Sequence, residues 1–520
     1  MLKRLSLFFL GAIYKVKLLE RARRLGLVVG VAYVVNYFPI GVNSAPINNN
    51  SSALIRLTKL PSIVDRDDPA SQRSLQQLDH LAAQLTKRAS NLTLDQALDQ
   101  GLLNNPGLAS AFFDIQGSQW SLIASRRSWY PSIQLTGNSA NYKGQSNALL
   151  GKEYSSLTTS SARSSEVQYS QPLSIAPVLL LNWTFFDATR VPAINQALSS
   201  LVAQRFLFDV AARNLVLNLQ VAYTNVQAES ELVLRYQWLL ELTRQQVLRA
   251  EVLVRQGRLT RASHDQLHTE QRLQLTRLID RYQKLFTASN ALASLVAVPP
   301  GQIVLSSSPF TLVPPWRQDL DSTLQQALTL REEIKQKLAL ADRDRWSAVR
   351  AINGYLPVFG LTGAGAYDDK RDQQYFQTSK ANIGLSFQWS LFDGGIKAAD
   401  SSSFRSQSAS QLSAATSAEL VVTKQVMDAY NVYVTSKLAL QNTGPDFSLS
   451  KRIVKDAVSA FSLNRDVTTL VQVFNLYISA ADRDVDTTRQ FNTSIFGLYR
   501  FSALWPNGLS SKVEQRRSGT

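Results

Sequence analysis

The sequence contains no cysteine and only three histidines in 520 residues. Without cysteine the chain forms no disulfide, no cysteine-ligated zinc or iron–sulfur site, no thiol nucleophile and no lipid anchor attached through a cysteine. Three histidines nearly exclude a histidine-rich metal site. Long apolar runs are also lacking, because the longest one, near the N-terminus, has about 16 residues and a spanning helix needs about 20. A polytopic helical membrane protein is therefore excluded, and we expect no metal and no cofactor.

Basic residues outnumber acidic ones, but outside the N-terminal segment the excess positive charge is spread along the whole sequence. The net charge is +16, and residues 1–45 supply +6 of it through seven basic residues and one acidic residue. The rest has no basic block beside a nucleic-acid-binding motif, so nucleic acid is not an expected partner. With 45% hydrophobic and 18% charged residues, the chain is too apolar for global disorder.

The N-terminus has the layout of an export signal. A basic stretch ends at Arg24, an apolar core runs from Leu25 to about Tyr37, and small residues follow around Ala45. This layout predicts a signal peptide over residues 1–45, with a single membrane anchor as the alternative. Prolines and a polar composition mark residues 46–91 as an N-terminal linker with a short helix.

Two parts of the remaining chain share a pattern, which predicts an internal duplication. Tyr130-Pro131 recurs 226 positions later as Leu356-Pro357, and the tryptophan-to-aspartate segment 183–187 recurs 206 positions later as 389–393. Since the offset falls between these anchors, the first copy carries a longer loop within residues 142–177. We predict repeats over residues 92–299 and 320–506, an inter-repeat linker over 300–319 and a C-terminal tail over 507–520.

Each repeat is expected to contain two amphipathic strands. Residues 382–391 alternate between apolar and small polar side chains. Ten such residues suffice for a tilted strand to cross a bilayer, and aromatic residues at strand ends suit a membrane interface. A soluble strand packed on a core is the alternative. We predict strands at 132–142, 178–186, 357–367 and 382–392, and a lipid-facing set made of Trp183, Ile383, Leu385, Phe387, Trp389 and Leu391.

Each repeat also carries a long helix followed by a returning one. Residues 194–256 contain no proline and no glycine, and apolar residues recur there at every seventh position. Such heptads indicate that one helix packs along another in a left-handed seam. The two stripes are Leu219, Val226, Val233, Leu240, Val247 and Val254, and Val426, Tyr433, Leu440, Phe447, Val454 and Phe461.

The predicted helices are 194–256 and 260–298 in the first repeat, and 398–462 and 466–504 in the second. Gly257 and Asn464 are expected to cap the long helices, since both accept the left-handed conformation. The second long helix is expected to be kinked or broken near residues 444–445, because Gly444-Pro445 interrupts it and the first repeat has no counterpart.

Four strands per chain are too few for a transmembrane barrel. Known barrels start at eight strands, and lipid does not tolerate open strand edges. The chain is therefore expected to pool its strands with other copies in a ring. The strand count alone fits two, three or four subunits.

In their order, these motifs resemble the outer-membrane efflux protein family, the TolC-like channel-tunnels. The resemblance covers roughly residues 90–505, and the matching segments are 92–98 (LTLDQAL), 104–108 (NNPGL), Tyr130-Pro131, 183–187, 389–395 and the turns that begin at Gly257 and Leu463. The resemblance implies an α+β membrane protein that is a homotrimer. Its 12-stranded transmembrane β-barrel, with four strands per chain, lies in the cell outer membrane, and a long α-helical barrel continues it through the periplasm.

The resemblance also implies a function without catalysis, so the chain is not expected to be an enzyme. It implies the exit duct of a tripartite efflux or type I secretion system, which passes small molecules or polypeptide outward. The implied partners are a periplasmic adaptor (membrane fusion) protein, an inner-membrane proton-driven or ABC-type pump, and outer-membrane lipid. An elongated coiled-coil envelope scaffold without a pore is the alternative, which explains the heptads but not the duplicated strands.

By the same resemblance, the helix turns at the periplasmic tip form an iris. Two positions that are acidic in some relatives fall on Thr469 and Gln472, which argues against a cation-selective acidic ring. Arg465 matches a basic residue that locks the tip in some relatives, with Asp265 as its hypothesised partner; a solvated arginine at a turn is the alternative. The predicted tip set is Gly257, Arg258, Asp265, Leu463, Asn464, Arg465, Thr469 and Gln472.

A pair of histidines is the remaining candidate for chemistry. His264 and His268 stand one helical turn apart, as in the zinc motif HExxH. Asp265 replaces the glutamate that acts as the base of that motif, and the third histidine, His80, lies in the linker. We therefore expect two exposed histidines on a helix, and no metalloprotease site.

Overall fold

The computed structural model describes residues 69–137, 150–152, 155–161, 164–170, 173–175, 177–371, 375–464, 466–506 and 508–518. These residues all belong to one unit, Ile47–Thr520. The predicted signal peptide, much of the N-terminal linker and Arg465 lie outside the described residues. Within the described part, no helix combines the length and the hydropathy that a membrane-spanning helix needs.

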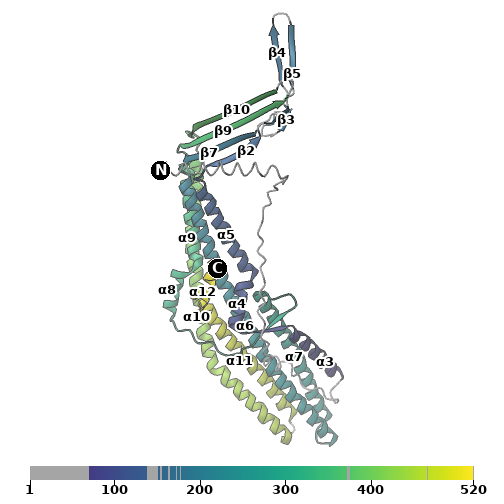
Figure 1. Cartoon of the computed structure of the whole chain (residues 1–520). Helices are drawn as coiled ribbons and strands as arrows, with labels where there is room; N and C mark the ends of the chain where they lie inside the picture. Colours follow the sequence, from purple (N-terminus) through teal and green to yellow (C-terminus); the bar gives the residue numbers. More distant parts are fainter. Residues whose placement is uncertain are drawn as a thin grey trace. The chain divides into compact units, whose positions relative to one another are not determined.

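The two predicted repeats have the same order of elements: two short helices, two strands, one long helix and one returning helix (Figure 1). The first set is α4 (Leu94–Asn104), α5 (Pro106–Arg127), β2 (Ser132–Gly137), β7 (Pro177–Phe186), α6 (Arg190–Arg255) and α7 (Arg261–Val296). The second set is α8 (Leu320–Leu330), α9 (Glu332–Asn353), β9 (Val358–Arg371), β10 (Tyr375–Gln388), α10 (Ile396–Asn464) and α11 (Val467–Phe501). This shared order supports a duplication.

The short motifs at the start of the first repeat are helix caps. Thr93 and Gln96 form a reciprocal capping box at the start of α4. Asn105 begins α5, where its side chain accepts hydrogen bonds from the backbone N–H groups of Gly107 and Leu108. Its amide also donates to the carbonyl of Leu295 at 3.0 Å. The two short helices are thereby fixed against the end of α7.

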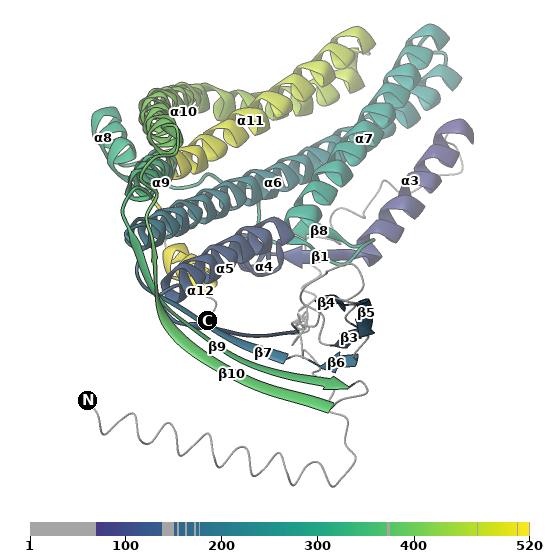
Figure 2. The same ribbon diagram turned by 90° about the horizontal axis from the view of Figure 1, so that it is seen from above.

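The long helices pack in antiparallel pairs, α6 with α7 and α10 with α11 (Figures 1 and 2). At 66 residues, α6 is about 100 Å long. From Leu219 to Val247 its heptad stripe is buried, and Val254 near its end is half-buried. On α10, Val426, Tyr433, Val454 and Phe461 are buried, while Leu440 and Phe447 are half-buried. The heptads therefore form seams within one chain.

The prediction that the second long helix is broken near residues 444–445 is wrong. In the structure α10 is helical throughout, with Pro445 inside it. Val454 and Phe461, which follow the proline, are buried in the same core cluster as Phe474 of α11. Packing along α11 thus outweighs the local cost of the proline, which is about 3 kcal/mol.

Two further expectations about the strands need correction. The strand predicted at 382–392 begins earlier, at Tyr375, and ends at Gln388, so Trp389 and Leu391 follow the strand. Pairing ends with Gln388 opposite Val358, because the preceding residue of the partner strand, Pro357, has no N–H to donate. Beyond the strand, the indole N–H of Trp389 donates to the carbonyl of Tyr355. The longer loop within 142–177 also contains strands: β3 (Leu150–Lys152), β4 (Ser155–Ser161), β5 (Ser164–Ser170) and β6 (Leu173–Ile175).

All four long predicted strands lie in one antiparallel sheet. Their order is β2, β7, β9, β10. The short strands β3 and β6 pair with each other, and β6 also pairs with the far end of β9, so they prolong the β2–β7 pair. Strands β4 and β5 form a separate hairpin (Figure 1).

The two linker regions meet in a small parallel sheet. Strand β1 (Ala89–Leu92) pairs with β8 (Ile303–Ser306), which follows the whole first repeat (Figure 2). The helix α3 (Pro69–Lys87) precedes β1 and packs on α7. At the other end of the chain, α12 (Leu509–Ser518) packs on α6 and α4 through the buried Leu509 and Val513.

The buried seam gives a stability prediction. Leu240, which is 2% exposed, lies in the core cluster of the long helices. Leu240→Ala should lower the free energy of unfolding by about 2–5 kcal/mol, because it removes buried apolar surface and leaves a cavity. Leu198→Ala is the matched control on the same helix, at a leucine that is 41% exposed. Thermal melting followed by circular dichroism measures both, and equal losses would contradict the seam.

Candidate functional site

The register of the sheet separates its side chains into two chemically different faces. Directly opposed residues of antiparallel strands point to the same face. One face carries Ile133, Leu135, Leu179, Leu181, Trp183, Phe359, Leu361, Ile383, Leu385 and Phe387. The other carries mostly small and polar residues, together with Val178 and Leu180: Ser132, Gln134, Thr136, Asn182, Thr184, Gly360, Thr362, Ala364, Asn382, Gly384 and Ser386.

The apolar face is open to its surroundings in the single chain. Ile383, Leu385 and Phe387 are 72%, 81% and 59% exposed. Among the described residues no core covers them, so within the single chain β10 is not a half-buried strand. A contiguous exposed apolar surface of this kind marks contact with lipid or with another protein. Trp183 shares this face, whereas Trp389 and Leu391 are exposed beyond the end of the strand.

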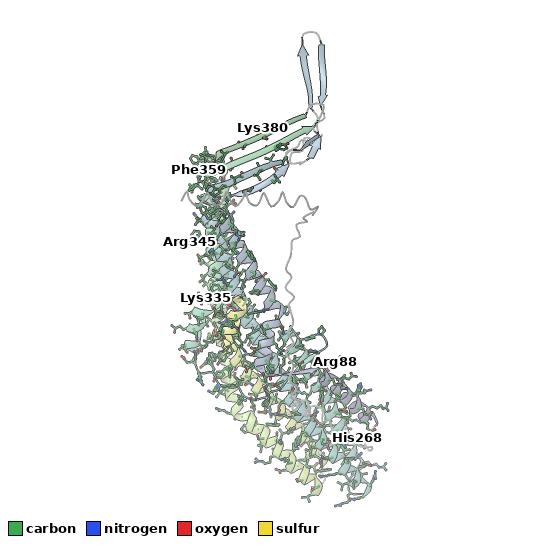
Figure 3. All side chains as sticks on the ribbon, viewed as in Figure 1. Arg88, His268, Lys335, Arg345, Phe359 and Lys380 are labelled. Atoms are coloured by element: carbon green, nitrogen blue, oxygen red, sulfur yellow. The ribbon has the colours of Figure 1, made fainter. Side chains whose placement is uncertain are left out.

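Aromatic rings gather where the sheet adjoins the helices. Phe359 packs on Phe387 with ring centroids 5.1 Å apart, and on Phe186 at 5.9 Å. Phe387 in turn packs edge-on against Trp389. Figure 3 labels Phe359 at this end of the sheet and Lys380 farther along β10. Rings at one end of an apolar sheet face have the arrangement of an interfacial aromatic belt.

The sheet is joined to the helices by the same contacts in both repeats. The indole of Trp183 donates to the carbonyl of Trp129, and that of Trp389 donates to the carbonyl of Tyr355. Trp129 and Tyr355, which accept these hydrogen bonds, each also have a cation over the aromatic ring. Arg190 Cζ lies 4.8 Å from the ring centroid of Trp129, and Lys397 Nζ lies 5.0 Å from that of Tyr355. These matching contacts fix the strand direction relative to the long helices.

The aspartate that ends each tryptophan-to-aspartate segment lies in the turn before the next long helix. Asp187 accepts from the backbone N–H and the hydroxyl of Thr189. Asp393 accepts from the N–H groups of Gly395 and Lys397. Tyr355 also donates its hydroxyl to Asp393 at 2.8 Å, and these hydrogen bonds hold the pKa of Asp393 below its usual range even though desolvation opposes the shift. The repeated aspartate is therefore a structural joint.

Both outer edges of the sheet are open. In the described part of the chain, β2 pairs only with β7, and β10 pairs only with β9. The backbone N–H and C=O groups along the other sides of these strands have no strand partner there. An open edge is a template for pairing with another chain.

The turn at the end of α6 has the geometry that its sequence predicts. Gly257 has a positive φ of 68°, its N–H donates to Val254, and the N–H of Arg258 donates to Leu253. This is a Schellman motif, which requires the left-handed conformation that glycine adopts without strain. Thr260 then caps α7 by accepting from the N–H of Ser263. The turn is thus fixed by local hydrogen bonds.

The second turn is set by an aspartate that sequence reasoning missed. Asp466 caps α11, where its carboxylate accepts from the hydroxyl and the N–H of Thr469. These hydrogen bonds hold the pKa of Asp466 below its usual range. The signal was an aspartate three positions before a threonine at a helix start. Leu463, Thr469 and Gln472 are exposed near this end of α11 and α10.

The hypothesised lock stays a prediction. Arg465 is outside the described residues, and Asp265, whose side chain is 77% exposed, has the Nδ1 atom of His264 3.2 Å from its carboxylate. The rings of His264 and His268 stack with centroids 6.1 Å apart. Among the described residues, no group of three or more potential metal ligands occurs.

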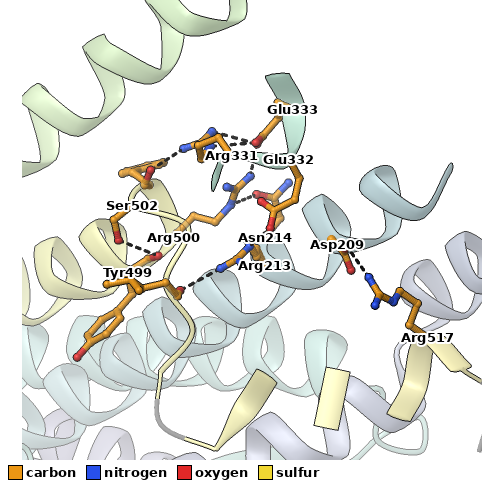
Figure 4. Close-up of polar contacts among 12 residues, drawn as sticks. Asp209, Arg213, Asn214, Arg331, Glu332, Glu333, Tyr499, Arg500, Ser502 and Arg517 are labelled. Atoms are coloured by element: carbon orange, nitrogen blue, oxygen red, sulfur yellow. Dashed lines mark hydrogen bonds and ion pairs between the residues drawn. The ribbon is translucent and has the colours of Figure 1, made fainter. Parts of the chain in front are cut away.

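Two clusters of buried and half-buried charge connect the repeats, and the sequence offered no signal for either. The junction cluster consists of Arg213, Arg331, Glu332, Glu333 and Arg500 (Figure 4). Arg213 contacts Glu332 at 2.8 Å, while Arg331 binds both oxygens of Glu333, at 2.9 and 3.0 Å. Arg500 reaches the same carboxylate at 2.6 Å. The cluster joins α6, the start of α9 and the end of α11.

The second cluster, here called the crossbrace, consists of Arg235 and Tyr236 on α6, Arg281 on α7, and Asp482 and Asp484 on α11. Arg235 contacts Asp484 at 2.8 Å, and Arg281 contacts Asp482 at 2.8 Å. The hydroxyl of Tyr236 donates to Asp482 at 3.0 Å. Burial raises the pKa of Asp482, and Arg281 opposes that shift. The crossbrace ties the α6–α7 pair to α11.

The protein has the fold of known outer-membrane channels. No protein-family model and no curated protein matches the sequence. The fold is similar to the CmeC outer membrane channel of Campylobacter jejuni, with a TM-score of 0.67, 14% identity, and coverage of 82% of this chain and 89% of that one. It is also similar to the outer membrane protein VceC of Vibrio cholerae (TM-score 0.61, 14% identity, coverage 79% and 95%). The MtrE outer membrane channel of Neisseria gonorrhoeae, in its open state, matches with a TM-score of 0.59, 15% identity, and coverage of 79% and 89%. The resemblance predicted from the motifs is thus confirmed at the level of the fold.

The junction cluster predicts how stability depends on pH. Burial alone would raise the pKa of Glu333, but Arg500 and Arg331 hold it at about 2, below its ordinary 4.5. Because the pKa is depressed in the folded state, this stabilisation is complete above about pH 4.5 and is lost as the pH falls toward 2. Glu333→Gln should therefore lower stability at pH 7 by about 2 kcal/mol, after allowance for partial exposure, and flatten the pH profile below 4.5.

Thermal melting between pH 2.5 and 7 measures this effect. Glu419→Gln, at an exposed carboxylate of α10, is the matched control. If the stability of Glu333→Gln falls with decreasing pH as steeply as that of the wild type, the depressed pKa of Glu333 does not contribute to folding.

Proposed function

We propose that this protein is the outer-membrane exit duct of a tripartite efflux or type I secretion system. The observation that carries the proposal is the amphipathic four-stranded sheet, which has two open edges and continues into two long helical hairpins. The fold it shares with outer-membrane channels supports the same function. The duct passes small molecules or polypeptide and performs no catalysis. A periplasmic adaptor and a proton-driven or ABC-type inner-membrane pump are its proposed partners.

Three copies close the proposed barrel. The helix contacts run in the order α5, α6, α9, α10, and the strands run β2, β7, β9, β10. One side of the chain therefore ends in α5 and β2, and the other side ends in α10 and β10. Pairing of β10 with β2 of the next copy leaves no open edge, and three copies contribute twelve strands.

Exposed apolar stripes lie on α5 and on α10, the two helices that would meet between neighbouring copies. Phe113 and Trp120, seven positions apart on α5, are 55% and 64% exposed. On α10, Leu420, Met427 and Val434 recur at every seventh position and are 69%, 44% and 38% exposed. Helices that carry such stripes pack as the heptad seams within the chain do. This surface, the α5–α10 contact, is proposed as the subunit interface of the helical barrel.

The proposed interface predicts the mass of the assembly. The double variant Phe113→Lys with Trp120→Lys should be a monomer where the wild type is a trimer, because it places two charges in an apolar contact. Light scattering in mild detergent measures the mass. Leu81→Lys on α3, at a leucine that is 46% exposed, is the matched control. A wild-type monomer would overturn the strand-pooling argument and favour the scaffold alternative.

The tip turns are proposed to form the narrow end of the duct, with Thr469 and Gln472 facing the opening. Since neither is charged, the constriction should select weakly between cations and anions. Gln472→Glu places one carboxylate per copy at the opening and should raise the cation-to-anion permeability ratio several-fold. Reversal potentials across planar bilayers measure the ratio. Gln283→Glu, at an exposed site on α7, is the matched control, and an equal rise in both variants would place Gln472 away from the opening.

The lock between Arg465 and Asp265 remains part of this proposal. If the lock holds the tip, Arg465→Ser should raise the single-channel conductance and Asp265→Asn should do the same. An unchanged conductance in both variants would leave Arg465 as a solvated arginine. A wild-type protein that inserts in bilayers but never conducts would favour the scaffold over the duct.

A further inference from the structure

A small cavity lies beside the junction cluster, between α6 and the end of α11. It offers the centre of a water-sized particle about 10 Å³, which is room for one water molecule or one monatomic ion. Three polar side chains line it, Arg213, Gln220 and Arg500, and they are only 6%, 4% and 6% exposed. Much of the remaining wall is apolar and includes Phe496 and Trp505. Polyatomic anions such as sulfate are too large for this space.

Arg500, which lines the cavity, has an unused hydrogen-bond donor (Figure 4). Its Nε atom donates to the side chain of Asn214 at 2.7 Å, and its Nη2 atom contacts the carboxylate of Glu333 at 2.6 Å. The Nη1 atom is buried and has no hydrogen-bond partner among the described residues. A buried N–H group without a partner is costly, so an acceptor within reach of Arg500 is favoured.

Arg213 borders the same cavity and is fixed by three contacts. Its Nε atom contacts Glu332 at 2.8 Å, and its Nη1 atom donates to the carbonyl of Leu504 at 3.0 Å. Its Cζ atom lies 4.0 Å from the ring centroid of Trp505. The Nη2 atom takes part in neither hydrogen bond, and the amide of Gln220 can donate as well. Among the described lining residues none carries a carboxylate, so the charged groups at the cavity are all cationic.

The junction cluster carries one more positive charge than negative, because its three arginines face two glutamates. The neighbouring carboxylate of Asp209 is bound by Arg517 at 3.0 Å, so that pair adds no net charge. Burial lowers the pKa of Arg213, Glu332 opposes this shift, and the positive charge of Arg500 adds to it. Two like charges thus lie close together at low dielectric, and a small anion between them would offset their repulsion.

The turn between α11 and α12 depends on the same arginines. Ala503 in this turn has a positive φ of 59°, a conformation that costs free energy in a residue with a side chain, so contacts from elsewhere must hold the turn. Arg213 makes one such contact by donating to the carbonyl of Leu504. Arg331 makes another by donating to the carbonyl of Phe501 at 3.2 Å. Any shift of the guanidinium of Arg213 therefore loosens this turn.

We propose that the cavity is a binding site for a small monovalent anion, chloride in particular. The ion accepts hydrogen bonds from the guanidinium groups of Arg213 and Arg500 and from the amide of Gln220. It balances the excess charge of the junction cluster and keeps Arg213 on the carbonyl of Leu504. The site thereby fastens the turn before α12 to the contact between the repeats. This inference goes beyond the proposed function and does not depend on it, because it concerns only contacts within one chain.

Hydrogen exchange of the full chain, assembled in mild detergent, measures this effect locally. Sodium chloride is compared with sodium gluconate at equal ionic strength, because gluconate is too large for the cavity. The amides of residues 502–505 should exchange at least about fivefold more slowly in chloride, with half of the effect reached on the order of 10 mM. The turn at residues 256–260, which does not line the cavity, should exchange equally in both salts. Equal exchange of residues 502–505 in the two salts would overturn the site.

A carboxylate fixed in the cavity should replace the ion. Gln220→Glu supplies one at nearly constant volume, so residues 502–505 should exchange slowly in gluconate and respond no further to chloride. Gln204→Glu, at a half-buried position of α6 outside the cavity, is the matched control and should keep the wild-type response. Gln220→Met removes the amide donor and should raise the chloride concentration for half of the effect several-fold. If Gln220→Glu responds to chloride as the wild type does, the ion does not bind in this cavity.

Bromide, which resembles chloride in charge and size, identifies the occupant directly. Anomalous diffraction from wild-type crystals grown in sodium bromide should give a peak within hydrogen-bond distance of Arg213 and Arg500, and crystals of Gln220→Glu should give none there. A water molecule in the wild-type cavity at saturating bromide, without an anomalous signal, would contradict the proposal. A peak without any effect of chloride on exchange would mean an adventitious ion only, and the proposed fastening of the turn would be wrong. Circular dichroism and light scattering confirm that each variant assembles.

Discussion

An antiparallel sheet with one apolar face and two unpaired edges is not stable alone in water or in lipid. Water disfavours the exposed leucine and phenylalanine side chains of β10, and hydrocarbon disfavours the unpaired backbone groups of β2 and β10. The proposed assembly resolves both problems, because in it the edges pair with other chains and the apolar face meets lipid. The orientation of the strands relative to the helices is set by two tryptophan hydrogen bonds, one in each repeat.

The helical part is held together by two kinds of contact. Apolar heptads hold each antiparallel pair together, but contacts between the pairs include buried ion pairs. In the junction cluster, Glu333 is bound by two arginines from different elements, so its removal would leave two buried cations without their partner. Breaking such an ion pair is costly because it leaves a buried charge without a partner, so these pairs strongly disfavour other registers. The two repeats are thereby held in one alignment over a long contact.

Local patterns predicted the elements, and tertiary packing decided where some of them end. The heptads of α6, the glycine turn at Gly257 and the amphipathic pattern of β10 depend on neighbours in the sequence, so they could be recognised from the sequence alone. Pro445 was misinterpreted as a break because the packing of α10 on α11 is not visible locally. The charge clusters were missed for the same reason: Arg235 and Asp484 come together only when two hairpins pack, and nothing in their spacing indicates it. The strands within 142–177 have short, serine-rich sequences that resemble a loop.

The pairing of β1 with β8 has a consequence for the order of folding. This parallel contact closes a loop of about 200 residues, whereas each helical hairpin forms from contacts between neighbours along the chain. Loop closure of that length is slow compared with hairpin formation. The segment before the first repeat therefore docks late, after α6 and α7 have formed the surface that receives α3. A chain intercepted before this step would have complete hairpins and an N-terminal segment still accessible to proteases.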